Sequence, residues 1–246
     1  MNSETQVVYG ARAVLEAVRS DWPIQQVYIQ KGVRGDLIRQ LEISLKEKGL
    51  TARYVPAERL AKYTQKNHQG VLADLSPVAY RDYRELIDSA AATGDAPLFL
   101  LLDGVTDVRN LGAMIRTAAC TGVHGLILPA SGSAGVTNDT IKTSAGAAYT
   151  LPIARSPHLK DVIYYLQASG IRVVAATEKA PDSIYDTDLR GPVAILMGSE
   201  GKGIHPALLK LCELRARLPM KGEIASLNVS VACGVFLYEA LRQREH

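Results

Sequence analysis

Residues 98–103, LFLLLD, are the stretch that decides the fold. Five apolar residues run without interruption up to Asp103, which is typical of a parallel strand buried on both faces. Apolar runs and amphipathic segments then alternate to the end of the chain. We expect further strands at 125–129, 171–177, 192–197 and within 213–220, and helices at 110–122, 138–148, 159–170, 205–212 and 227–244. This alternation predicts an open, mainly parallel α/β sheet covered by helices on both faces.

A smaller α/β pattern precedes this sheet. Strands are expected at 25–30, 51–55 and 70–75, and helices at 36–49 and 56–64. The stretch that follows is rich in proline, glycine, alanine and acidic residues, and it contains one helical segment near residues 83–92. We therefore expect a front domain over 1–75, a linker over 76–97 and a larger domain over 98–246.

Composition excludes several classes of protein. The 246 residues are 47% hydrophobic and 22% charged, which fits a soluble globular protein and excludes a disordered or collagen-like chain. No apolar run approaches the ~18–20 residues that span a bilayer, and no charged-then-apolar leader precedes Val7, so we expect a cytoplasmic protein without membrane association.

The three cysteines lie far apart and lack C-x-x-C spacing. This pattern argues against a disulfide framework or a zinc site and fits a reducing cytoplasm, and no metal ion is expected. We expect Cys120, Cys212 and Cys233 all to be buried as small hydrophobic residues.

Charge is distributed unevenly along a chain whose net charge is +3. Residues 1–75 carry 11 basic and 8 acidic groups, whereas residues 76–95 carry two basic and four acidic groups. The modest basic excess of the front domain is compatible with RNA binding but does not require it.

The first polar segment to follow a predicted strand is DGVTDVRNLGAMIRTA (103–118). Ligands of parallel sheets bind beyond the carboxyl ends of the strands, so such segments are candidate sites. Asn110 stands where the helix is expected to begin, and it could simply cap that helix. Arg116 lies about one and a half turns further on, where its side chain can reach back toward Asn110. Its partner is then either a structural acid or a ribose or phosphate oxygen.

Two more polar segments follow later strands. MGSEGKGI (197–204) contains three glycines that permit close backbone approach, yet it is neither a Walker loop nor a dinucleotide fingerprint. Its Glu200 suits a cationic or hydroxyl-bearing ligand. In LPMKGEIASLNVSVACGVF (218–236), Ser226 and Asn228 precede the last helix, a pattern that capping alone would explain.

Together the three segments resemble motifs 1, 2 and 3 of the SpoU (TrmH) branch of the SPOUT RNA methyltransferases. The matching stretches are NLGAMIRTA, MGSEGKGI and SLNVSVA, in the family's order, and the resemblance extends over essentially the whole chain. Residues 7–75 look like the family's L30e-like substrate-binding domain. This arrangement is most similar to the group that methylates a guanosine 2′-hydroxyl in 23S ribosomal RNA.

The resemblance implies a SPOUT α/β-knot catalytic domain with a C-terminal trefoil knot, a homodimer with each active site near the subunit interface, and S-adenosylmethionine as cofactor. It implies catalytic roles for Asn110, Arg116, Glu200 and Asn228. The cofactor would be held by the knot loops, through Thr177, Met197, Gly198, Gly203, Leu218, Met220, Ser226 and Leu227. The expected reaction is transfer of a methyl group to a ribose 2′-hydroxyl of RNA.

Three other functions remain open at this stage. A transfer RNA ribose 2′-O-methyltransferase is the first, although such relatives often lack the front domain. A non-catalytic RNA-binding ribosome assembly factor is the second, and the intact Asn110, Arg116 and Glu200 count against it. A Rossmann dehydrogenase is the third, and its glycine fingerprint is missing. None of the five histidines has a catalytic setting, and we expect His68 and His205 to form polar loop contacts.

Overall fold

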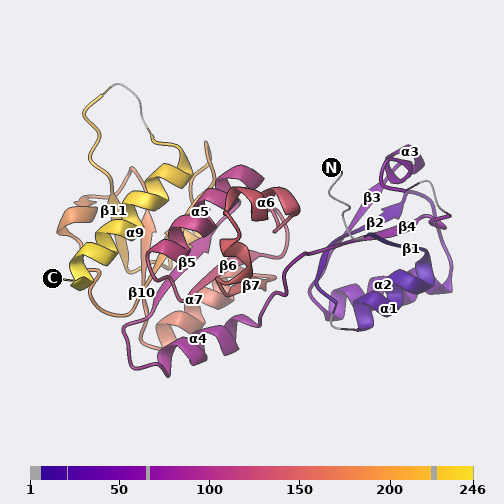
Figure 1. Ribbon diagram of the computed structural model, residues 1–246, viewed down its shortest axis with the longest axis horizontal. Helices are drawn as coiled ribbons and strands as arrows, with labels where there is room; N and C mark the ends of the chain where they lie inside the picture. The colour runs from indigo at the N-terminus through magenta and orange to yellow at the C-terminus, as the bar shows by residue number, and fades with distance from the viewer. Residues whose placement is uncertain (1–6, 21, 65–66, 223–225, 246) are drawn as a thin grey trace. The chain divides into compact units, whose positions relative to one another are not determined.

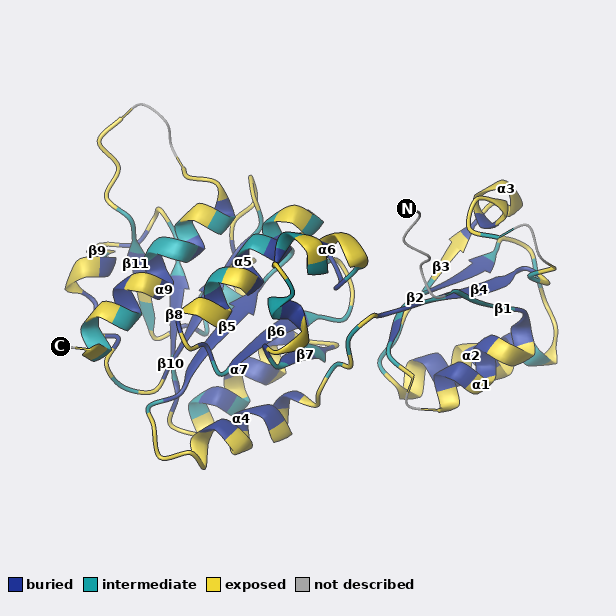
Figure 2. Ribbon diagram, viewed as in Figure 1, coloured by how far each residue is buried: buried dark blue, intermediate teal, exposed yellow. Residues whose placement is uncertain are grey.

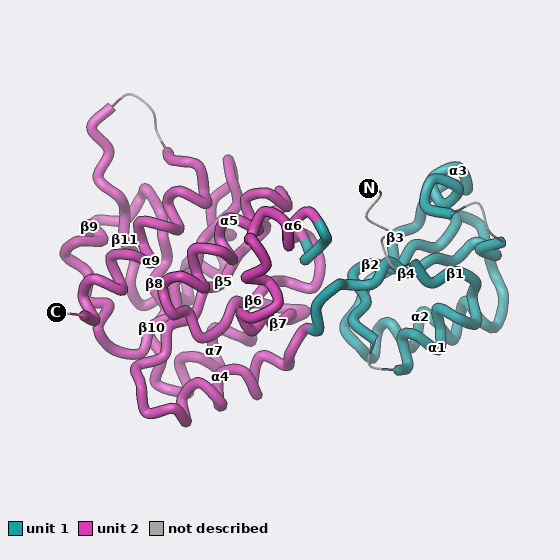
Figure 3. The backbone as a smooth tube through the Cα atoms, viewed as in Figure 1, with its two compact units in different colours: residues 1–79, 135–138 teal, residues 80–134, 139–246 magenta. Residues whose placement is uncertain are grey.

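The computed structural model describes residues 7–20, 22–64, 67–222 and 226–245. Its chain divides into two compact units, shown in separate colours in Figure 3. Unit 1 comprises Met1–Ala79 with Gly135–Asn138, and unit 2 comprises Tyr80–Ala134 with Asp139–His246. Each unit has its own sheet and its own buried core.

Unit 1 contains a four-stranded sheet in the order β1-β4-β2-β3. The strands are β1 (Val7–Tyr9), β2 (Ile24–Gln30), β3 (Ala52–Val55) and β4 (Val71–Leu75). The helices are α1 (Ala11–Arg19), α2 (Asp36–Glu47) and α3 (Ala57–Ala61). Strand β4 pairs antiparallel with both neighbours, and β2 pairs parallel with β3. The structure therefore confirms an α/β front region.

Alternation along the strands decides which face of this sheet each helix covers. In β2, Val27 and Ile29 belong to the core beneath α1 and α2, whereas Tyr28 packs on the opposite face with Leu60 of α3. Figure 1 shows α1 and α2 lying along one face of the sheet.

Unit 2 contains a seven-stranded sheet in the order β7-β6-β5-β10-β8-β11-β9, and every pairing in it is parallel. The strands are β5 (Leu98–Leu102), β6 (Gly125–Pro129), β7 (Ile153–Ser156), β8 (Arg172–Ala176), β9 (Asp182–Ser183), β10 (Val193–Met197) and β11 (Leu214–Arg217). The helices are α4 (Tyr83–Ala91), α5 (Val108–Cys120), α6 (Asn138–Thr143), α7 (Leu159–Ala168), α8 (Pro206–Leu209) and α9 (Val229–Glu245), with 3-10 turns η1 (Ala147–Tyr149) and η2 (Ile184–Asp186). The parallel sheet predicted from LFLLLD is confirmed, and all five residues of β5 are buried (Figure 2).

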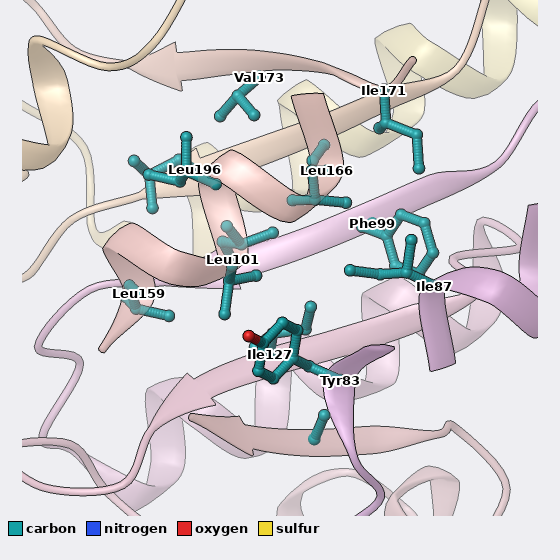
Figure 4. Close-up of a cluster of buried hydrophobic side chains, with 14 of the residues drawn as sticks. Tyr83, Ile87, Phe99, Leu101, Ile127, Leu159, Leu166, Ile171, Val173 and Leu196 are labelled. Carbon is teal, nitrogen blue, oxygen red and sulfur yellow. The ribbon is translucent and has the colours of Figure 1, made fainter. Parts of the chain in front are cut away.

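Helices cover both faces of this sheet. On one face, Phe99 and Leu101 of β5 pack with α4 and α7, as the side chains in Figure 4 show. On the other face, α5 and α9 pack against each other and bury their apolar stripes. The helix α4 falls within residues 76–97, and its Ile87 is fully buried in this core. The segment that joins the two units is therefore shorter than the expected linker.

Arg244 fixes the end of α9 at the amino ends of the strands. Its guanidinium donates hydrogen bonds to the carbonyls of Ala96 (2.7 Å), Gly191 (2.8 Å) and Leu189 (3.1 Å). Burial lowers the pKa of this guanidinium, but the backbone carbonyls compensate for its lost hydration. Because one end of α9 is held there, its first turn lies toward the carboxyl ends of β5 and β10.

The three cysteines differ in their exposure. Cys120 is exposed at the end of α5, so the expectation that all three cysteines are buried is wrong. Cys212 and Cys233 are buried, which raises the pKa of their thiols to about 11 and about 12.

Over the described residues, no helix is long and apolar enough to cross a membrane, and no three His, Cys, Asp or Glu side chains group as they would around a metal ion.

Candidate active site

The carboxyl ends of β5 and β10 bring the first two motif segments together. The strands pair in register from Leu98 to Leu102, and the Asp103 N–H donates to the Met197 carbonyl at 2.8 Å. The Asp103 carboxylate in turn accepts a hydrogen bond from the His205 N–H at 2.7 Å. Through these two hydrogen bonds, Asp103 connects the end of β5 to both ends of the glycine-rich loop, at Met197 and at His205.

Asp107, rather than Asn110, caps the helix of motif 1. Helix α5 begins at Val108, and the Asp107 carboxylate accepts hydrogen bonds from the backbone N–H groups of Arg109 and Asn110. The Asn110 side chain therefore does not cap the helix, and Asn110 is the third residue of its first turn. The capping interpretation of Asn110 is wrong, and the sequence signal for the true cap was an aspartate three positions earlier.

The glycine-rich loop after β10 folds back on itself. Ser199 and Gly203 exchange backbone hydrogen bonds of 3.1 and 2.9 Å, and Gly203 has a φ of 67°. A Cβ atom on Gly198 would lie only 2.1 Å from the carbonyl carbon of Gly203. Only glycine fits at position 198, and the tight loop that results places Glu200 at its tip.

Asn228 joins all three motif segments. Its Nδ2 donates to Asn110 Oδ1 at 3.1 Å and to Glu200 Oε1 at 2.6 Å. Its Oδ1 accepts from the Ser230 N–H (2.9 Å) and hydroxyl (2.6 Å), so the same side chain caps α9. Glu200 Oε1 also accepts from the Val229 N–H at 3.3 Å, which places a carboxylate at the positive end of the α9 dipole.

Arg116 lies outside this network. It is exposed on α5 and forms no hydrogen bond or ion pair with any described residue. The structural-acid interpretation of Arg116 therefore finds no partner in the described part of the chain. Its guanidinium is available to a ligand.

The candidate cofactor residues lie in three segments at the same end of the sheet. Thr177 follows β8, with its N–H bonded to the Ala216 carbonyl at 3.0 Å. Met197 and Gly198 are buried at the end of β10. Leu218 and Met220 follow β11, and Ser226 and Leu227 precede α9. Residues 223–225, in the same loop, lie outside the described residues.

Both histidines expected to make loop contacts do so. His68 Nδ1 accepts from the Gly70 N–H at 3.0 Å, and His205 Nδ1 accepts from the Ala207 N–H at 3.2 Å. A nitrogen that accepts a backbone hydrogen bond in this way is occupied, so neither histidine is arranged as a general base.

Comparison with known families accounts for almost the whole chain. Residues 97–238 match the model of the SpoU rRNA Methylase family, and residues 7–81 match the model described as RNA 2′-O ribose methyltransferase substrate binding. Among curated relatives, a putative TrmH family tRNA/rRNA methyltransferase of Bacillus subtilis is 34% identical over 99% of this chain and 98% of its own. The 23S rRNA (guanosine-2′-O-)-methyltransferase of Shewanella oneidensis, RlmB, is 38% identical over 97% of each chain.

Solved structures agree with these relatives. The SpoU methyltransferase AviRb of Streptomyces viridochromogenes, in complex with AdoMet, is 26% identical over 97% of this chain and 90% of its own, with a TM-score of 0.62. An AdoMet-bound rRNA methyltransferase of Sinorhizobium meliloti is 28% identical over 96% of this chain and 86% of its own, with a TM-score of 0.61. With both family models matched and the three motif segments joined at one end of a parallel sheet, the chain belongs to the SpoU family of RNA methyltransferases.

Proposed function

We propose that this enzyme transfers the methyl group of S-adenosylmethionine to a guanosine ribose 2′-hydroxyl of 23S ribosomal RNA. The observation that carries the proposal is the hydrogen-bonded network of Asn110, Glu200 and Asn228, together with an Arg116 on the same helix as Asn110 that pairs with no described residue. Ribosomal RNA as substrate would place the enzyme in the cytoplasm.

The cofactor supplies a sulfonium methyl group to the attacking ribose 2′-oxygen. The chain's own residues then have two tasks, to align the ribose and to assist departure of its hydroxyl proton. A guanidinium carries five hydrogen-bond donors and no acceptor, which makes Arg116 a poor base, so its role is to hold the ribose and neutralise the neighbouring phosphate. Asn228 and Glu200 keep the motif loops in place around the reacting atoms.

The residues at the end of the sheet fit S-adenosylmethionine. The backbone groups of Leu218, Met220 and Leu227 form no backbone hydrogen bond with another described residue, so they can pair with the polar edge of an adenine. The side chains of Met220 and Leu227 are exposed apolar groups that can contact its faces. In the proposed enzyme these loops complete the trefoil knot around the cofactor.

A ribosomal RNA substrate is favoured over transfer RNA by the share of the chain that each relative matches. The RlmB relatives match both units of this chain. A solved structure concerned with 2′-OH methylation of C/U34 on tRNA is 28% identical, with a TM-score of 0.55, and matches 60% of this chain but 96% of its own. The substrate-binding unit thus has its counterpart in the ribosomal RNA enzymes.

The proposed enzyme is a homodimer that uses the exposed apolar side of α9. A hollow of about 460 Å³ on this side is lined by Tyr185, Val231, Gly234, Val235, Tyr238, Glu239 and Arg242. Tyr185, Val231 and Tyr238 are each more than half exposed, and a group of exposed apolar side chains of this kind is unusual on the surface of a monomer. Light scattering should give a dimer for the parent protein and a monomer for Tyr238→Glu, whereas Tyr164→Glu on α7 should remain dimeric.

Methyl transfer from labelled S-adenosylmethionine tests the reaction itself. The purified protein should label a 23S rRNA transcript and not transfer RNA, and nuclease digestion should yield 2′-O-methylguanosine. Label confined to transfer RNA would refute the substrate, and label on a base rather than a ribose would refute the reaction. Cofactor binding without any transfer to RNA would support the non-catalytic alternative instead.

A further inference from the structure

The exposed side of α5 carries a second arginine that no motif accounts for. Residues Arg109, Ala113, Arg116 and Cys120 recur at intervals of three and four, so they share one helix face, which we call the α5 strip. Arg109, Arg116 and Cys120 are exposed, and Ala113 is half-buried. The two arginines are separated by two turns, about 10.5 Å along the helix axis.

Neighbouring helices border this strip on both sides. On one side Gly112 packs against α6, where a Cβ atom on Gly112 would lie 2.6 Å from Thr143 Cβ. On the other side Thr117 faces Gly234 of α9, at 3.9 Å from the position of a Cβ on that glycine. The strip is thus an exposed track between two helices, with a small residue, Ala113, between its two cations.

Arg109 has no described partner to neutralise it. It forms no side-chain hydrogen bond or ion pair with a described residue, and α5 contains no acidic residue at all. Every other arginine of unit 2 except Arg81 and Arg116 contacts an acid, an aromatic ring or a backbone carbonyl in the described structure. Arg109 and Arg116 on the α5 strip therefore differ from these arginines, because no described residue pairs with either guanidinium.

We infer that Arg109 is a positioning residue that binds a phosphate of the substrate RNA strand, one or more nucleotides from the phosphate held by Arg116. Its chain neighbour Asn110 belongs to the Asn228 network, so a phosphate on Arg109 fixes the strand directly beside the motif 1 loop. A guanidinium fork suits phosphate oxygens, and the spacing of the two arginines lets each contact a different phosphate. This inference rests on the proposed function, since it assigns the path of the same RNA.

Binding of a 23S rRNA transcript by the full-length protein at several salt concentrations tests the inference. Arg109→Ala should raise the Kd about tenfold at low salt, because it removes a charge-assisted contact. It should also reduce the slope of log K against log salt by about 0.7–0.9, the value for one lost phosphate contact. Arg109→Lys should keep the slope and recover part of the affinity. In methylation assays the loss in Arg109→Ala should fall on the KM for RNA more than on kcat, and the affinity for S-adenosylmethionine should stay at the parent value.

Arg81→Ala is the matched control, because Arg81 is also exposed and unpaired among the described residues, beside the edge strand β7. It should leave both the affinity and the salt slope near the parent values. Unchanged binding by Arg109→Ala, an equal loss in Arg81→Ala, or a lost melting transition in both Arg109 variants would overturn the inference. Failure of the proposed function is distinguishable, since it would appear as absent methyl transfer by the parent protein whatever Arg109 contributes to binding.

Discussion

Asn228 Nδ2 donates a hydrogen bond to Asn110 Oδ1 at 3.1 Å, which joins two residues 118 positions apart in the chain. The same amide group also donates to Glu200, so one side chain positions motifs 1, 2 and 3 together. Because Asn228 caps α9 as well, the orientation of the last helix and the geometry of the site depend on the same residue. Such a shared contact predicts coupling between the motifs.

Asn110→Ala and Asn228→Ala should each lower kcat, and their effects should not add. Both changes remove the same hydrogen bond, so the double variant should be little worse than Asn228→Ala alone. A double-mutant cycle on kcat/KM should give an interaction energy in the range of about 0.5–3 kcal/mol. Asn110→Ala combined with Tyr164→Ala on α7 should be additive, and full additivity of the asparagine pair would show that the network does not act as a unit.

Arg116→Ala should abolish turnover while it leaves cofactor affinity within a few fold. The exposed guanidinium forms no hydrogen bond or ion pair with the described residues, so we expect it to act on the RNA rather than on the cofactor. Calorimetric titration with S-adenosylmethionine and single-turnover methylation would separate the two effects. A folded Arg116→Ala protein that no longer binds the cofactor would contradict this role.

Gly198→Ala should disrupt the glycine-rich loop and with it cofactor binding. The added methyl group would collide with the backbone of Gly203 and Ile204, at 2.1 and 2.2 Å, and backbone atoms cannot move aside as a side chain can. Gly191→Ala is a suitable control, because its Cβ would meet only the Arg172 guanidinium at an ordinary 3.6 Å. Thermal melts with and without S-adenosylmethionine should show a lost cofactor-induced shift for Gly198→Ala alone.

Asp74→Asn should stabilise unit 1 at high pH and have little effect at low pH. Burial raises the pKa of the Asp74 carboxyl to about 6 from its ordinary 3.8, and its buried Oδ1 has no hydrogen-bond partner. The folded state therefore binds the proton more tightly than the unfolded state, so stability falls as the pH rises from about 4 through 6. An uncharged amide at position 74 does not ionise, so it removes this pH-dependent loss of stability.

Thermal melts or amide exchange in unit 1, measured at pH 5 and pH 8, would check the prediction. The stabilisation by Asp74→Asn should be larger at pH 8, where the parent carboxylate is ionised. Asp95→Asn removes an exposed carboxylate from the other unit and should give no gain in unit 1 at either pH. An equal gain at both values would mean that ionisation of Asp74 is not the cause.

Local sequence patterns predicted five of the seven strands of the unit 2 sheet and the three segments that meet at its edge. Periodicity found β5 because a strand buried on both faces leaves an uninterrupted apolar run. It missed the two edge strands, the four-residue β7 with Arg155 in its middle and the two-residue β9. It also left Asn110 open as a cap of α5. Capping depends on which side chain reaches the free N–H groups, and Asp107 does so here.

The features that the sequence could not predict depend on contacts between segments that are distant in the chain. No spacing rule connects Asn228 with Glu200, since their hydrogen bond exists only after the loops of two strands and a helix converge. The exposure of Cys120 likewise depends on which turn of α5 meets α9. The roles assigned to Asn110, Arg116, Glu200 and Asn228 remain predictions, which the substitutions above are designed to test.

The two units should have separable functions, with unit 2 binding the cofactor and unit 1 selecting the RNA. Unit 2 has its own sheet and core, and α4 belongs to that core, so a truncated protein should begin at Tyr80 rather than after residue 97. Residues 80–246 should fold and bind S-adenosylmethionine, yet lose most activity on a 23S rRNA transcript because they lack the unit that matches the substrate-binding model.

Salt dependence provides the second measurement on this truncation. The charge excess of residues 1–75 is only +3, which allows a few phosphate contacts at most. The full-length protein should therefore show a steeper fall of RNA affinity with salt than residues 80–246, by no more than about three times the slope of a single contact.

A truncation that starts at residue 98, without α4, serves as a control and should be unstable, because it exposes the core that Leu86 and Ile87 cover. Undiminished methylation and an unchanged salt slope for residues 80–246 would show that unit 1 does not select the RNA, and that its basic excess is an ordinary solvated surface.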